Sequence, residues 1–166
     1  MAKITLKGNP LHTVGELPKV GADVSDLKVT KSDLTDVGLS AFAGKQVVLN
    51  IFPSVDTSVC ATSVRRFNQE AAGLANVIVL CVSMDLPFAL NRFCGAEGIK
   101  NVQTASAFRH SEFGQKLGVR IIDGGMAGLL ARSIVLLDGA GRVKYTQLVP
   151  EIAQEPDYAA ALAAAR

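Results

Sequence analysis

Two apolar runs separated by a helical pattern constrain the fold of this chain more than any other feature. Residues 46–52 (QVVLNIF) and 76–84 (NVIVLCVSM) are almost continuously apolar, which is typical of strands that are buried on both faces of a sheet. Between them, apolar side chains recur at helical spacing at Val59, Val64, Phe67, Ala71 and Leu74. This order predicts a strand–helix–strand unit at the centre of an α/β fold.

The same alternation continues towards the C-terminus. A helix is predicted at residues 88–94 after Pro87, and a third strand at residues 102–108. There follow a short helix at 112–117, a glycine-rich loop at 118–128, strands at 131–137 and 142–149 joined by the turn DGAG, and an alanine-rich helix after Pro156. These elements predict an α/β sandwich in which helices flank a central mixed sheet.

The N-terminal part of the chain is expected to add to this sandwich. Residues 3–7 and 11–14 are short extended runs on either side of Gly8-Asn9-Pro10, which is a strong turn signal, so we predict an N-terminal β-hairpin. The next segment, up to Gly44, predicts short strands, loops and one helical turn near residues 38–42. With 166 residues and no internal repeat or linker, residues 1–166 are expected to form one domain.

Composition and charge exclude several classes of protein. Hydrophobic residues make up 49% of the chain and charged residues 19%, as in a packed globular protein. The formal net charge of +2 is too small for a protein that grips a phosphate backbone, so nucleic acid is not an expected partner. No apolar run approaches the roughly 18 residues of a membrane-spanning helix, and the N-terminal segment lacks the apolar stretch of a secretory leader. We therefore expect a cytoplasmic protein with no membrane partner.

The candidate site lies where the first apolar strand gives way to its helix. The segment PSVDTSVC places Cys60 in the first turn of that helix, just beyond the carboxyl end of the strand. Partial positive charge at a helix N-terminus favours a thiolate over a thiol, so Cys60 is a candidate nucleophile. Thr57, three residues earlier, can place its hydroxyl beside the sulfur. A buried structural cysteine is the alternative interpretation.

This segment resembles the PxxxTxxC active-site motif of the peroxiredoxins, and PSVDTSVC followed by SVRRFN resembles their thiol peroxidase subfamily. The resemblance extends to GNPL near the start, to VLCVSMDLPFALNRFCGAEG, to GLLARS and to the EPDY tail. It implies a thioredoxin-like fold with an added N-terminal hairpin. It also implies a peroxidase that reduces hydrogen peroxide and alkyl hydroperoxides to water and alcohols without a metal or other cofactor.

The resemblance implies roles for five residues. Cys60 would be the peroxidatic cysteine, whose thiolate attacks a peroxide oxygen and becomes a sulfenic acid. Pro53 would shield the sulfur, Thr57 would hydrogen-bond the thiolate and the peroxide, and Arg132 would supply a cation. Cys94 would resolve the sulfenic acid by forming an intramolecular disulfide. The resemblance further implies recycling by thioredoxin, a homodimer and a task in antioxidant defence.

The remaining cysteine and the two histidines carry weaker expectations. Cys81 lies in the middle of an apolar run and is predicted to be a buried core residue. The spacing of the cysteines, His12 and His110 does not match a structural zinc site, so no metal is expected. If Cys60 and Cys94 lie on two ordered helices, both helices must unwind locally before the sulfur atoms can join.

Three other functions compete with the peroxidase. A thioredoxin-like disulfide oxidoreductase would need a second cysteine where Thr57 stands. A peroxide sensor or redox-regulated binding protein would signal through a bond between Cys60 and Cys94. A cysteine hydrolase would need a histidine base, and neither His12 nor His110 lies in the setting of a known cysteine–histidine signature.

Overall fold

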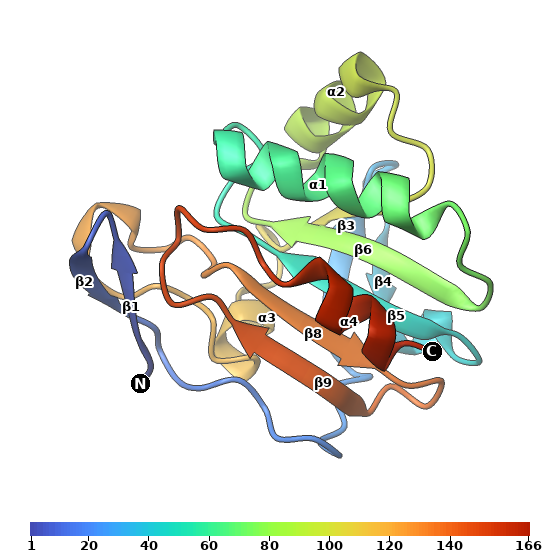
Figure 1. Ribbon diagram of the computed structural model, residues 1–166, viewed down its shortest axis with the longest axis horizontal. Coiled ribbons are helices and arrows are strands. Elements are labelled where there is room, and N and C mark those ends of the chain that lie inside the picture. The colour runs from blue at the N-terminus through green and yellow to red at the C-terminus, as the bar shows by residue number, and fades with distance from the viewer.

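A computed structural model describes residues 1–166 and shows a seven-stranded sheet with helices on both faces (Figure 1). The strands of this sheet are β3 (Lys28–Lys31), β4 (Asp36–Gly38), β5 (Gln46–Ile51), β6 (Val77–Ser83), β7 (Gln103–Ser106), β8 (Ser133–Leu137) and β9 (Val143–Leu148). They lie in the order β4-β3-β7-β6-β5-β8-β9. The pairs β5–β6 and β6–β7 are parallel and the others are antiparallel, which confirms the predicted mixed sheet.

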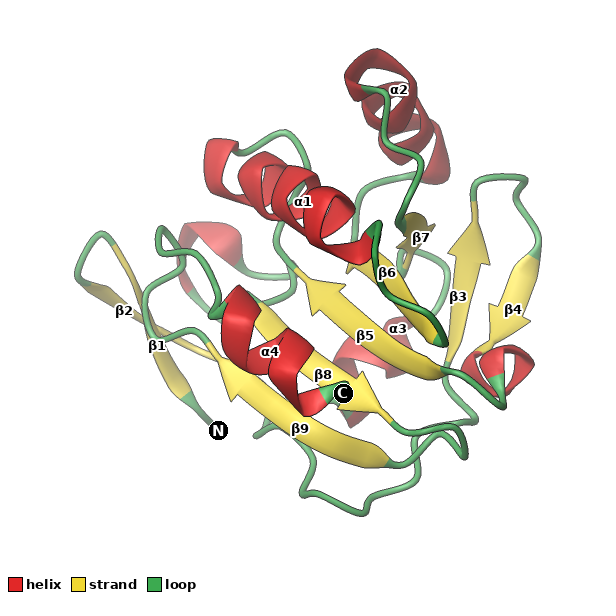
Figure 2. Ribbon diagram, turned by 45° about the vertical axis from the view of Figure 1, so that its right-hand side comes forward, coloured by secondary structure: helices red, strands yellow, loops and turns green.

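Two layers of helices cover the sheet, as the turned view in Figure 2 shows. The helices are α1 (Ser58–Ala71), α2 (Pro87–Glu97), α3 (Ser111–Lys116) and α4 (Tyr158–Ala164), with 3-10 turns η1 (Leu39–Phe42) and η2 (Gly124–Met126). One core cluster joins α1, α2 and α4 to the sheet, and the other contains residues of α3, η1 and the N-terminal segment. The predicted succession of strands and helices is confirmed, with bounds that differ by a few residues.

The central strand β5 is almost continuously apolar because both of its faces are buried. Successive side chains of a strand point to opposite faces of the sheet. Val47 and Leu49 join the core on the α3 side, whereas Val48 joins the core beneath α1 and α4. Because both faces are covered, neither can carry a row of charged side chains. The one polar side chain in the buried part of the strand, Asn50, is part of the candidate site.

The predicted N-terminal hairpin is confirmed, but the predicted turn is wrong. The strands are β1 (Lys3–Leu6) and β2 (Asn9–His12), which pair antiparallel as a separate two-stranded sheet. The turn consists of Lys7 and Gly8, with φ angles of 51° and 82°, and Pro10 lies in the strand. Positive φ at both positions is the pattern of a type I′ hairpin turn, and Gly8 adopts it without strain.

The structure also contains no helix that is both long enough and apolar enough to span a membrane.

Candidate active site

The loop between β5 and α1 is clamped to the neighbouring strand by one carboxylate. Asp85, just after β6, accepts hydrogen bonds from Ser54 Oγ at 2.7 Å and from the backbone N–H of Val55 at 2.8 Å. Its position is fixed by Ser83 Oγ, which donates to the same carboxylate at 2.6 Å. Pro53 is buried at the start of this loop. The clamp therefore sets where α1 begins, and the sequence reasoning did not identify Asp85.

Cys60 and Arg132 lie in direct contact inside the protein. Cys60 is in the first turn of α1 and is 0% exposed, and Arg132 is 1% exposed. The Nη2 atom of Arg132 donates to Cys60 Sγ at 3.2 Å. Arg132 immediately precedes β8, which runs antiparallel to β5 with Ser133 opposite Ile51. This register brings the start of β8 to the carboxyl end of β5, where α1 begins.

The guanidinium group of Arg132 has no acidic partner. Its Nε atom donates to the carbonyl oxygen of Ile152 at 2.8 Å, and its buried Nη1 atom makes no hydrogen bond within the protein. A buried cation without a counterion is costly. The guanidinium therefore contacts the Cys60 sulfur and keeps one N–H donor, Nη1, without a partner in the protein.

Thr57 is the N-cap residue of α1 and lies at the protein surface. Its Oγ1 atom donates to the carbonyl oxygen of Ser54 at 3.0 Å, and its side chain does not cap the helix. The expected hydrogen bond between this hydroxyl and Cys60 Sγ is not formed, because the donor to that sulfur is Arg132. Because a hydroxyl that donates one hydrogen bond still has two lone pairs, Thr57 can accept a hydrogen bond from a bound molecule.

A buried polar chain holds the backbone of Cys60. Ser63 Oγ donates to the carbonyl oxygen of Cys60 at 2.8 Å, and Asn50 Nδ2 donates to Ser63 Oγ at 3.2 Å. Asn50 Nδ2 also lies 3.6 Å from Cys81 Sγ. The sequence reasoning missed this chain, although a polar residue inside an apolar run is a signal that could have revealed Asn50. The prediction that Cys81 is a core residue is confirmed, and burial raises the pKa of its thiol to about 12.

Cys94 lies on α2, and its thiol points towards β7. The thiol is partly buried, its Sγ atom is 3.8 Å from Thr104 Oγ1, and burial raises its pKa. All three cysteines are free thiols, with Cys60 and Cys94 on two separate ordered helices. The prediction that both helices unwind locally before the two sulfur atoms join therefore applies to this arrangement, and it stays a prediction.

Exposed ion pairs connect α1 and its preceding loop to α2. Arg65 on α1 forms two hydrogen bonds of 2.9 Å with Glu97, and Arg92 on α2 lies 3.0 Å from Asp56 in the loop before α1. A single exposed pair such as Arg92–Asp56 contributes little to stability, whereas two parallel hydrogen bonds such as those of Arg65–Glu97 make a stronger pair.

Neither histidine belongs to the surroundings of Cys60. His12 Nδ1 lies 2.7 Å from Asp123, and His110 lies 3.0 Å from Asp36 on the far edge of the sheet. The hydrogen-bond partner of Cys60 Sγ is an arginine, which cannot act as a base at neutral pH. The geometry gives no support to a cysteine hydrolase.

The fold and this site define a redox-active thiol enzyme of thioredoxin-like architecture. The Redoxin family matches residues 18–162 of the chain. The thiol peroxidase of Mycobacterium tuberculosis (strain ATCC 25618 / H37Rv) is 62% identical over 164 residues, which cover 99% of this chain and 98% of the relative. The thiol peroxidase of Corynebacterium glutamicum is 56% identical and covers 99% of each chain.

Solved structures agree with these relatives. A peroxiredoxin-like protein from Aquifex aeolicus has a TM-score of 0.90 at 41% identity, covering 98% of this chain and 95% of its own. A thiol peroxidase from Chromobacterium violaceum shares the fold, with a TM-score of 0.84 at 21% identity over 95% of this chain and 91% of its own. The chain belongs to the thiol peroxidases of the Redoxin family and is a peroxiredoxin-type oxidoreductase that reduces peroxides.

Proposed function

We propose that this protein reduces hydrogen peroxide and alkyl hydroperoxides through the thiolate of Cys60, as part of antioxidant defence. The observation that carries the proposal is the buried contact of 3.2 Å between Arg132 Nη2 and Cys60 Sγ. The sulfur attacks the terminal peroxide oxygen, so that an S–O bond forms while the O–O bond breaks. Sulfur is oxidised to sulfenic acid, and the other oxygen leaves and takes up a proton from solvent, equal to the one that Cys60 released on ionising, to become water or an alcohol.

Three other residues serve this step. Negative charge develops on the leaving oxygen, and the free Nη1 donor of Arg132 is placed to stabilise it. The Thr57 hydroxyl accepts a hydrogen bond from the peroxide O–H group, and buried Pro53 shields the sulfur from water. In this proposal the protein supplies all of the chemistry through its own side chains, and no metal or cofactor takes part.

The second half of the cycle uses Cys94. We propose that its thiol attacks the sulfenic acid at Cys60, releasing water and forming an intramolecular disulfide that thioredoxin reduces. Support comes from the position of Cys94 on the helix next to α1, and from the exposed ion pairs that link α2 to α1 and its preceding loop. In this proposal α1 and α2 unwind locally, which breaks these surface pairs and lets the two cysteines meet.

A coupled assay with thioredoxin, thioredoxin reductase and NADPH tests this cycle. Wild type should turn over with both cumene hydroperoxide and hydrogen peroxide. Cys94→Ser should still consume about one equivalent of peroxide but should lose at least about tenfold in steady-state NADPH oxidation, because its sulfenic acid is not resolved. Asp138→Asn, at the opposite end of β8 from Arg132, should keep full turnover. A wild type that forms the disulfide once and is never recycled would favour the peroxide-sensor alternative.

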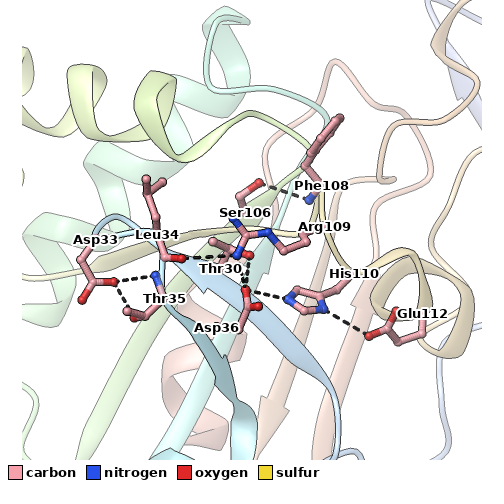
Figure 3. A network of polar contacts seen from close by, with 10 residues as sticks. All are labelled: Thr30, Asp33, Leu34, Thr35, Asp36, Ser106, Phe108, Arg109, His110 and Glu112. Atoms are coloured by element: carbon pink, nitrogen blue, oxygen red, sulfur yellow. Dashed lines mark hydrogen bonds and ion pairs between the residues drawn. The ribbon is translucent and has the colours of Figure 1, made fainter.

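We also propose a homodimer, in which a second copy covers one apolar patch. Leu34, Leu86, Phe88 and Phe108 are 42–67% exposed and line one cavity of about 220 Å³. Figure 3 shows that Asp36, at the start of β4, accepts hydrogen bonds from Thr30, Arg109 and His110. These bonds hold the turn that carries Leu34 against the segment after β7. A cluster of exposed large apolar side chains is typical of an interaction surface, and this cluster supports the proposal.

The double variant Phe88→Glu/Phe108→Glu should convert the dimer into a monomer, because each substitution places charge in the apolar contact of both copies. Light scattering after size exclusion measures the mass directly. Val20→Glu serves as the control, since Val20 is 70% exposed and lies outside the patch. A wild type with the mass of one chain would contradict the proposal, as would a double variant that stays dimeric.

A further inference from the structure

The N-terminal hairpin touches the main fold at the loop between β9 and α4. Figure 1 shows the two segments side by side, the hairpin in blue and the loop in red. Thr5 on β1 receives a hydrogen bond at its carbonyl oxygen from the N–H of Ile152 at 2.9 Å, and its own N–H donates to Pro150 at 2.8 Å. The hairpin therefore pairs with this loop through its backbone.

Glu151 strengthens this junction with both of its carboxylate oxygens. Its Oε1 atom accepts hydrogen bonds from the N–H of Gly8 at 2.9 Å and from Thr5 Oγ1 at 3.2 Å, and its Oε2 atom accepts one from the N–H of Ala153 at 2.8 Å. The bonds to the two N–H groups lower the pKa of the Glu151 carboxyl, so it is charged at neutral pH. The Glu151 side chain thus connects the hairpin turn at Gly8 to the backbone N–H of Ala153.

The peptide held in this way is the one that holds Arg132. The carbonyl oxygen of Ile152 accepts the hydrogen bond from Arg132 Nε, and Arg132 Nη2 in turn contacts Cys60 Sγ. Because a guanidinium group is planar and rigid, fixing Nε fixes the direction of both Nη atoms. The same loop also borders the first turn of α1, since Ala153 and Gln154 share a surface cavity with Ser58 and Val59.

We propose that the N-terminal hairpin is a positioning element for Arg132, with Glu151 as the positioning residue that transmits its hold to the Ile152 carbonyl. The inference rests on the proposed function, because positioning matters only if Arg132 and Cys60 carry out the chemistry. Glu151 touches neither Cys60 nor Arg132, and it acts by keeping the Ile152 carbonyl where the guanidinium needs it. Small errors in the placement of catalytic groups can cost on the order of a hundredfold in rate.

The test compares Glu151→Ala with Asp138→Asn in the full chain. Asp138 is a matched control, because its carboxylate also accepts two backbone N–H groups, those of Ala140 and Arg142, but at the opposite end of β8 from Arg132. Stopped-flow oxidation of Cys60 by hydrogen peroxide should slow by about tenfold in Glu151→Ala and stay unchanged in Asp138→Asn. Glu151→Gln keeps one acceptor oxygen, so its oxidation rate should lie between those of Glu151→Ala and Asp138→Asn.

Two readouts separate positioning from general destabilisation. The pH profile of Cys60 alkylation by iodoacetamide should move to higher pH in Glu151→Ala, because the sulfur loses part of its contact with the cation. In the Arg132→Met background, Glu151→Ala should have no further effect on either rate, since coupled residues are not additive. Equal slowing in both backgrounds would overturn the proposal, and so would an unchanged oxidation rate.

The alkylation readout also separates this inference from the proposed function. A wild type that fails to reduce peroxide would overturn the peroxidase mechanism by itself. The shift in the alkylation profile would then still report whether Glu151 sets the contact between Arg132 and Cys60.

Discussion

Cys60→Ser is expected to abolish hydroperoxide reduction while leaving the fold intact. A serine hydroxyl is not ionised at neutral pH and has no neighbouring base here, because its one side-chain partner would be Arg132. The loss should be at least about a thousandfold, as is usual when an enzyme loses its nucleophile. NADPH oxidation coupled to thioredoxin and its reductase measures it with either peroxide. Serine is close in size to cysteine, so the unfolding temperature should change little.

The control for this variant is the position of oxidation in the wild type. Mass spectrometry of the wild type after one equivalent of peroxide should place the oxidation at Cys60, either as sulfenic acid or as a bond to Cys94. Substantial activity in Cys60→Ser would identify another cysteine as the nucleophile and would contradict the mechanism.

Arg132→Met should lower the peroxidase activity without lowering the stability of the fold. Loss of a preorganised donor to a developing negative charge costs about a hundred- to a thousandfold in rate, and the loss in kcat/KM for peroxide should fall in that range. Methionine has a similar length and no charge, so the cost of burying a guanidinium group disappears. The unfolding temperature should therefore stay level or rise, although the Ile152 carbonyl loses its partner.

Arg132→Lys is the matched comparison for this site. A lysine keeps the charge but lacks the planar fork, so it cannot bond the Ile152 carbonyl and the Cys60 sulfur in the present geometry. It should recover part of the rate lost in Arg132→Met. A loss below about tenfold in Arg132→Met would show that the cation contributes little, and the role of the buried contact would have to be revised.

The sequence predicts the central part of the fold because its signals are local. The strands β5 and β6 are apolar on both faces, and Pro87 marks the first turn of α2. The hairpin turn was misplaced by a residue or two, because Gly8-Asn9-Pro10 contains three turn formers while the structure uses Lys7 and Gly8. Turn signals of this kind show that the chain reverses, but they do not fix the strand register.

In the candidate site, too, residues with a local signal can be predicted from the sequence, and residues that depend on distant contacts cannot. Cys60 is predictable from its place at a helix N-terminus, which is a local property. Arg132 was reached only through resemblance, because its contact with Cys60 depends on the antiparallel pairing of β8 with β5. Glu151 carries no sequence signal, since its partners Thr5 and Gly8 lie 146 and 143 positions away.

The contact between Cys60 and Arg132 also has a consequence for the biosynthesis of this protein. The arginine follows the cysteine by 72 positions and reaches it only when β8 has paired with β5. A growing chain that has not yet emerged from the ribosome as far as β8 therefore lacks this contact. The part proposed for Arg132 in the chemistry of Cys60 begins only when the sheet is complete.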